Sequence, residues 1–168
     1  HMRVKLQMEP EEVLQAVTDS VTLARNFADD VEWSCEDGTR SEHDFMCRTV
    51  EAAIDAGADA FQGTGVHVVR GIEIYQNRPV FYGLGEFVRQ RDVDGFSGLG
   101  ELRRDACAGC PFPAKYESFI AISEFSGGTL REVRLHPVEL RYDAERMAHR
   151  GIPRIAPPET AQRILTRL

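Results

Sequence analysis

The spacing of apolar residues predicts two amphipathic helices near the start of the chain. The first begins around Pro10, which suits the first turn of a helix, and its apolar residues share one face: Leu14, Val17, Val21 and Ala24. The second opens at Ser41, with Asp44 three residues on as in a capping box, and ends at Gly57. Its apolar face holds Phe45, Val50, Ala53 and Ile54.

Short runs typical of β-strands lie on both sides of the second helix. Residues 31–34 form one run, and residues 58–62 follow the helix stop. A strand, a helix and a strand in this order predict a βαβ unit with parallel pairing and a right-handed crossover.

Beyond residues 63–65 the pattern changes to the alternation of antiparallel strands. Residues 72–82 predict one hairpin and residues 119–135 a second. The intervening segment, residues 89–113, is rich in charge, glycine and proline and reads as a long loop. A short terminal helix starts at Pro157, with three apolar residues expected inward: Ala161, Ile164 and Leu165. The expected fold class is α/β: a mixed sheet that starts with a parallel βαβ unit and continues with antiparallel hairpins.

Composition narrows the classes of partner. With 20 Lys and Arg against 27 Asp and Glu, the 168-residue chain has a net charge of -7 and no basic stripe for a phosphate backbone, so nucleic acid is not an expected partner. No apolar run approaches the roughly 18 residues of a membrane span, and residues 2–12 lack the apolar stretch of a secretory signal. The chain as given is expected to be cytoplasmic.

The four cysteines do not predict a disulfide scaffold in an acidic chain of this size. Cys107 and Cys110 have the spacing of a redox pair or of half a zinc knuckle. No second pair in register accompanies them, and a proline-rich loop follows where a redox motif would open a helix. Neither role is favoured.

Several short sequence motifs in the first third of the chain resemble those of a known family. They are KLQM at residues 5–8, VTLARN at 21–26, DDVEWS at 29–34, EDGTR at 36–40 and VEAA at 50–53. Residues 1–57 resemble the catalytic barrel of 2-isopropylmalate synthase, the acetyl-CoA-dependent acyltransferase of leucine biosynthesis. The resemblance implies one barrel helix, one strand and the next helix, whereas a complete barrel has eight strand and helix units.

Only Glu32 is carried over from that resemblance as a candidate catalytic residue, at the expected end of the strand in Val31-Glu32-Trp33-Ser34. The family's metal site uses an acidic residue on its first strand and a His-x-His motif, and this chain has neither. The alternative reading of Glu32 is an exposed acid at a strand end.

A second set of short sequence motifs carries a resemblance that covers about two-thirds of the chain. They are AGADA at residues 56–60, RGIEIY at 70–75, RPVFYGLG at 78–85 and HRGIPR at 149–154. Residues 52–168 resemble the bacterial capsule and poly-γ-glutamate synthesis family, whose fold is that of the metallophosphatases. The resemblance implies the C-terminal portion of such a domain, without the strands that supply its first metal ligands. We therefore divide the chain into residues 1–57 and 58–168.

Two departures bear on the metal centre that this family implies. Family members commonly read Gly-His-x-Pro-His where this chain has Gly63-Thr64-Gly65-Val66-His67, and Leu-Gly-Asn-Phe where it has Leu84-Gly85-Glu86-Phe87. His67 and Glu86 remain as candidate ligands for a divalent metal, Mn²⁺ or Zn²⁺. The alternative is a structural, hydrogen-bonded histidine, because a hydrolytic site needs several converging ligands and an open position.

Three hypotheses about function follow. The first is a capsule-synthesis-type metallophosphatase remnant without intact catalytic activity, and the second is an acyltransferase fragment of the isopropylmalate synthase type. The third is a non-catalytic product of recombination or splicing. A sheet that is incomplete relative to both parent folds would leave an open edge, so self-association is also expected.

Overall fold

The computed structural model describes residues 5–38, 41–89 and 114–168. These residues form two compact units. Of the described residues, the first unit contains 5–38, 41–65 and 72–82, and the second contains 66–71, 83–89 and 114–168. The units are defined by contacts in space, whereas the division at residues 57 and 58 rests on resemblance and stays a prediction.

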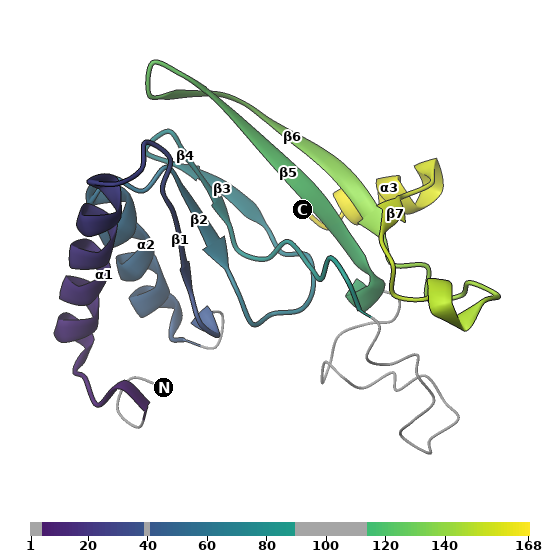
Figure 1. The fold of residues 1–168 in the computed structure, drawn as a ribbon, viewed down its shortest axis with the longest axis horizontal. Helices are drawn as coiled ribbons and strands as arrows, with labels where there is room; N and C mark the ends of the chain where they lie inside the picture. Colours follow the sequence, from purple (N-terminus) through teal and green to yellow (C-terminus); the bar gives the residue numbers. More distant parts are fainter. Residues whose placement is uncertain (1–4, 39–40, 90–113) are drawn as a thin grey trace. The chain divides into compact units, whose positions relative to one another are not determined.

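The first unit is a four-stranded mixed sheet with two helices (Figure 1). Its elements are α1 (Pro10–Arg25), β1 (Glu32–Cys35), α2 (His43–Asp55), β2 (Ala60–Gly63), β3 (Ile72–Tyr75) and β4 (Arg78–Phe81). The strand order is β1-β2-β4-β3, with β1 parallel to β2, β2 parallel to β4, and β3 antiparallel to β4. The predicted α/β class, the βαβ unit and the first hairpin are therefore confirmed.

Apolar faces of the two helices build the core of the first unit. Val17 and Val21 of α1 cluster with Val31, Ala53 and Ala58. A second cluster joins α2 to β2 and β4 through these buried residues: Met46, Val50, Ile54, Phe61 and Val80. In both clusters the helix residues are four positions apart. The helical period of the sequence therefore places them on the faces that pack against the sheet.

The start of α2 differs from the prediction. The helix begins at His43 with Glu42 as its N-cap, so the expected capping box of Ser41 and Asp44 is wrong. The backbone N–H of Ser41 instead donates to the carbonyl of Gly38 in the preceding turn, at 2.9 Å, which places Ser41 before the helix. A capping box is present at α1, where the N–H of Glu9 donates to the Glu12 carboxylate.

The second unit contains an antiparallel sheet of order β5-β6-β7. Its elements are η3 (Ala114–Tyr116), β5 (Glu117–Ser126), β6 (Thr129–Glu139), η4 (Met147–His149), β7 (Arg154–Ile155) and α3 (Pro158–Leu165). Gly127 and Gly128 form the turn between β5 and β6, both at positive φ. The second predicted hairpin is confirmed, and it builds a sheet separate from the one in the first unit.

Helix α3 packs in the second unit through one apolar position and an ion-pair network. Ile164 is fully buried, and the carboxylate of Glu117, itself 2% exposed, pairs with the guanidinium groups of Arg163 and Arg167. Leu165 is 40% exposed, so its expected inward placement is wrong. It follows Ile164 directly, and one residue turns a helix by about 100°, away from the buried face.

Most of the expected long loop, including Cys107 and Cys110, lies outside the described residues. Within the described parts of the chain, none of the helices combines the length and the apolar character needed to cross a membrane.

Candidate functional site

The structure brings together His67 and Glu86, the two residues that the sequence marks as candidate metal ligands. Both lie in the second unit, and the Nδ1 atom of His67 is 2.7 Å from an oxygen of the Glu86 carboxylate. The side chain of His67 is 55% exposed and that of Glu86 is 21% exposed. The contact therefore orients an imidazole that solvent can reach.

Short backbone pairing places the two segments side by side. Val69 and Leu84 form an antiparallel bridge, and the N–H of Arg70 donates to the carbonyl of Gly83 at 2.9 Å. Gly85 has φ +83°, and a Cβ atom there would lie 2.6 Å from the carbonyl oxygen of Glu117. Both the backbone conformation and the available space thus require glycine just before Glu86, which explains Gly85 in the Leu84-Gly85 motif.

Arg89 completes the cluster, and sequence reasoning missed it. Its Nη1 atom is 2.5 Å from the second oxygen of Glu86, and its side chain is only 6% exposed. Its backbone N–H donates to the carbonyl of Gly151 at 2.8 Å, which fixes the segment that carries it. The prediction placed Arg89 at the start of a long loop. The available signal was a basic residue three positions after Glu86, and outside a helix this spacing does not predict a contact.

The backbone of His67 is in the left-handed region, with φ 56°. A residue with a Cβ atom pays a cost there, and such residues gather at sites that constrain the chain. The left-handed backbone and the side-chain contact with Glu86 therefore occur at the same residue. His67 is held in place although half of it is exposed.

The cluster does not fit the metal centre that the capsule family implies. One oxygen of Glu86 contacts His67 and the other pairs with Arg89, so a cation bound to this carboxylate would lie beside a guanidinium. Among the described residues, no three His, Cys, Asp or Glu side chains gather in a possible metal site. A metal site in a hydrolase needs about three protein ligands and an open position. Metal binding by His67 and Glu86 stays a prediction.

Glu32 lies in the first unit, and its expected position at the end of a strand is wrong. It is the first residue of β1, where it pairs with Ala60 at the start of β2, and it is exposed. The parallel strands end at Cys35 and Gly63. Ligands of parallel sheets bind outside the carboxyl ends of the strands, so Glu32 lies at the opposite end from such a site. Its catalytic role stays a prediction.

Cys35 occupies the carboxyl end of β1, but its chemistry is suppressed. Burial raises the pKa of its thiol, with hydrogen bonds from the backbone N–H groups of Cys35 and Gly38 acting in the opposite direction. A thiol that stays protonated is a poor nucleophile and a poor metal ligand. Thr64 donates a hydrogen bond to the backbone carbonyl of Cys35, which ties the ends of β1 and β2 together.

Comparison with known proteins finds two kinds of relative. Residues 12–91 match the family described as bacterial capsule synthesis protein PGA_cap. Two proteins of Sinorhizobium fredii, named Uncharacterized protein y4sH and y4uA, are each 38% identical over 160 residues, covering 79% of this chain and 34% of their own length. The chain is therefore similar to the capsule-synthesis family, and the match begins well before residue 52.

The other relatives are 2-isopropylmalate synthases. The enzyme of Bradyrhizobium sp. (strain BTAi1) is 69% identical over 58 residues, and that of Caulobacter vibrioides is 66% identical over 58 residues. Each match covers 34% of this chain and 11% of the synthase. Both expected resemblances are confirmed. The chain spans about a third of the length of the Sinorhizobium relatives and about a tenth of the synthases.

Proposed function

We propose that this chain is a capsule-synthesis-type, metallophosphatase-like remnant without intact catalytic activity. The observation that carries the proposal is the pairing of Glu86 with both His67 and Arg89. A metallophosphatase carboxylate gives its oxygens to a cation, whereas Glu86 gives one to an imidazole and the other to a buried guanidinium. The positive charge of Arg89 occupies the place where a cation would have to balance the carboxylate.

This arrangement supports a structural role for the cluster. Each group in it balances another, because a carboxylate held between an imidazole and an arginine needs no further cation. A histidine oriented by a carboxylate can still move a proton. Proton transfer alone does not polarise a phosphoryl oxygen, which is the contribution of the metal in hydrolases of this class.

Isothermal titration calorimetry with Mn²⁺ tests the proposal. We expect only the heat of dilution from the unaltered chain, and hydrolysis of p-nitrophenyl phosphate with excess Mn²⁺ at the rate of buffer alone. Binding of about one Mn²⁺ per chain that is lost in His67→Ala and kept in the matched exposed variant His43→Ala would overturn it. Metal-dependent hydrolysis with the same mutational pattern would do so independently.

The second candidate, an acyltransferase of the isopropylmalate synthase type, is supported by the 69% identity over 58 residues. The position of Glu32 at the amino end of β1 argues against it, since active sites of such barrels form at the carboxyl ends of the strands. We expect no release of free thiol from acetyl-CoA with 2-oxoisovalerate. Turnover that depends on Glu32 and is absent in Glu32→Gln would reverse this preference.

A further inference from the structure

Among the described residues, no strand pairs with the outer edge of β5, and β5 exposes apolar side chains. β5 is the terminal strand of its sheet, and its ten residues make it the longest edge strand among the described residues. Its exposed side chains include Ile120, at 38%, and Ile122, at 43%. Natural edge strands are usually protected by charged residues, Pro or a bulge. Residues 118–123 contain no charged residue, no Pro and no register shift, and both Glu124 and the register shift come after them.

The register shows which backbone groups face outward along this edge. The N–H of Phe119 donates to the carbonyl of Leu84, so Phe119 points away from β6, where its partner Pro137 has no N–H to offer. Backbone groups of an antiparallel strand alternate in direction, so those of Ala121 and Ser123 also point outward. The register shift between Glu124 and Phe125 ends the regular edge. We call residues 120–124 the β5 edge.

We propose that the β5 edge pairs antiparallel with the β5 edge of a second copy of this chain, about a two-fold axis at Ile122. This register uses only residues beyond the contact of Phe119 with Leu84 and before the bulge. Ala121 of each copy then faces Ser123 of the other, and their outward N–H and C=O groups bond in pairs. Ile122 meets Ile122 of the second copy, where side chains of such a pair approach most closely.

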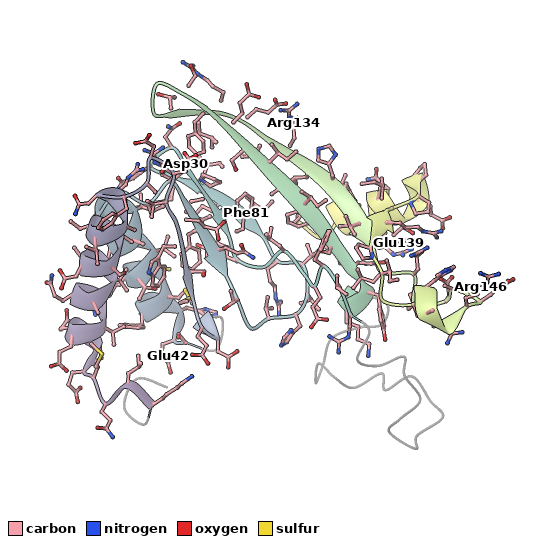
Figure 2. The ribbon with its side chains drawn as sticks, in the orientation of Figure 1. Asp30, Glu42, Phe81, Arg134, Glu139 and Arg146 are labelled. Carbon is pink, nitrogen blue, oxygen red and sulfur yellow. The ribbon has the colours of Figure 1, made fainter. Side chains whose placement is uncertain are left out.

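The charges of the hairpin fit this pairing. Glu124 falls opposite Ile120 of the second copy, so like charges do not meet across the new edge. Arg134 is the β6 partner of Ile122, and it pairs with Glu124 of its own hairpin at 3.1 Å and with Glu132 at 3.4 Å. Figure 2 labels Arg134 on this hairpin. Glu124 therefore already has a cationic partner within its own copy, and Arg134 shares its single positive charge between Glu124 and Glu132.

Two variants of the full chain test the interface, with sedimentation velocity over a range of concentrations as the readout. Ile122→Lys places two like charges at the axis, and we expect it to raise the dimer dissociation constant by about tenfold or more. Ser123→Pro removes an outward N–H from each copy without touching the bonds to β6, and should have a similar effect. The matched control is Ile74→Lys, an isoleucine on β3 that is 53% exposed. It should leave the dimer intact.

Hydrogen exchange of the unaltered chain gives a result that does not depend on how the variants fold. We expect the amides of Ala121 and Ser123 to become protected as the concentration rises through the dissociation constant. A monomer at every concentration overturns the proposal. So does a dimer that both variants leave unchanged, or protection of these amides that is the same in the monomer.

Discussion

Asp59 in the first unit and Glu86 in the second are carboxylates with similar partners and different consequences. Asp59 pairs with Arg25 at 2.9 Å and with Arg78 at 3.4 Å, and it also accepts a hydrogen bond from the backbone N–H of Val31 at 3.1 Å. Every ion-pair side chain in this set is less than one-third exposed, the largest value being the 30% of Arg25. These contacts join α1, the start of β1, the start of β2 and the turn of the first hairpin.

Glu86 also holds two cationic or potentially cationic groups, but one of them, His67, is half exposed and strained. The cluster joins only short neighbouring segments of the second unit. In that unit Glu117, which is 2% exposed, joins segments that are distant in the sequence. It pairs with Arg163 of α3 and with Arg167 just after α3. The comparison separates carboxylates that hold elements together from one that positions an exposed side chain. The difference lies in where the partners come from: Asp59 and Glu117 pair with residues of helices and strands, some of them distant in the sequence, whereas Glu86 pairs with neighbouring irregular segments.

The largest expected effect is that of Asp59→Asn. The amide cannot balance two guanidinium groups, and its NH₂ end cannot accept from Val31, so two arginine side chains that are only 20–30% exposed lose this carboxylate. We expect a loss of about 2–3 kcal/mol in the free energy of unfolding, measured by urea denaturation. Asp30→Asn, a change of the same kind at an exposed aspartate next to Val31, should cost less than about 0.5 kcal/mol.

Equal effects of the two aspartate substitutions would contradict the comparison, because they would mean that the contacts of Asp59 add nothing to an exposed charge.

The contacts of Asp59 also bear on the two resemblances. Arg25 and Val31 come from the part that resembles the synthase, and Asp59 and Arg78 from the part expected to resemble the capsule family. The ion pairs and the hydrogen bond of Asp59 therefore join residues from both sides of the expected division of the chain.

The elements of the fold could be predicted because they depend on local patterns. The periods of α1 and α2, the stop at Gly57 and the turn at Gln76 and Asn77 are all readable from neighbouring residues, and the turn has the positive φ angles that favour Asn there. The contacts of Asp59 and Arg89 could not be predicted. They join segments that are distant in sequence or irregular in backbone, and the sequence contains no period that would connect them.

The candidate site was only half predictable for the same reason. His67 and Glu86 were selected by resemblance to a family with a metal centre, and the structure places them in contact. Resemblance to a family does not reveal contacts made by residues outside the matching motifs, and the pairing of Arg89 with Glu86 is such a contact. The position of Glu32 failed because the strand begins one residue later than the expected run of residues 31–34, which makes Glu32 its first residue.

A smaller effect is expected from a pair of substitutions at His67. Glycine adopts the left-handed backbone without strain and alanine does not, so His67→Gly should be more stable than His67→Ala by about 1 kcal/mol. The loss of the imidazole is common to both variants, and their difference therefore isolates the backbone cost. Thermal unfolding measures it.

An alanine variant as stable as the glycine variant would show that His67 carries no backbone strain. The matched pair at the exposed turn residue Asn77, with φ 62°, provides the reference. If the difference at position 67 equals that at position 77, the strain is that of an ordinary turn. A larger difference at position 67 means that the contacts of the second unit enforce the conformation.

The smallest effect concerns a third carboxylate, Glu73, whose partner is neutral. The hydroxyl of Tyr82 donates to Glu73 at 2.7 Å, and burial, followed by this hydrogen bond and the negative charge of Glu73, raises the pKa of Tyr82 well above its ordinary value. Because the folded state holds the phenolic proton more tightly than the unfolded state, the associated stability is fully present below about pH 10. It is lost as the pH rises above that value.

Glu73→Gln should therefore lower the pKa of Tyr82 but leave it raised, since burial is the leading cause and remains. At neutral pH the free energy of unfolding should change by less than about 0.5 kcal/mol, because Glu73 is exposed and the tyrosine is protonated in both states. NMR titration of ring-labelled tyrosine, assigned with Tyr82→Phe, measures the shift. An ordinary pKa for Tyr82 in the unaltered chain would mean that water reaches its hydroxyl freely.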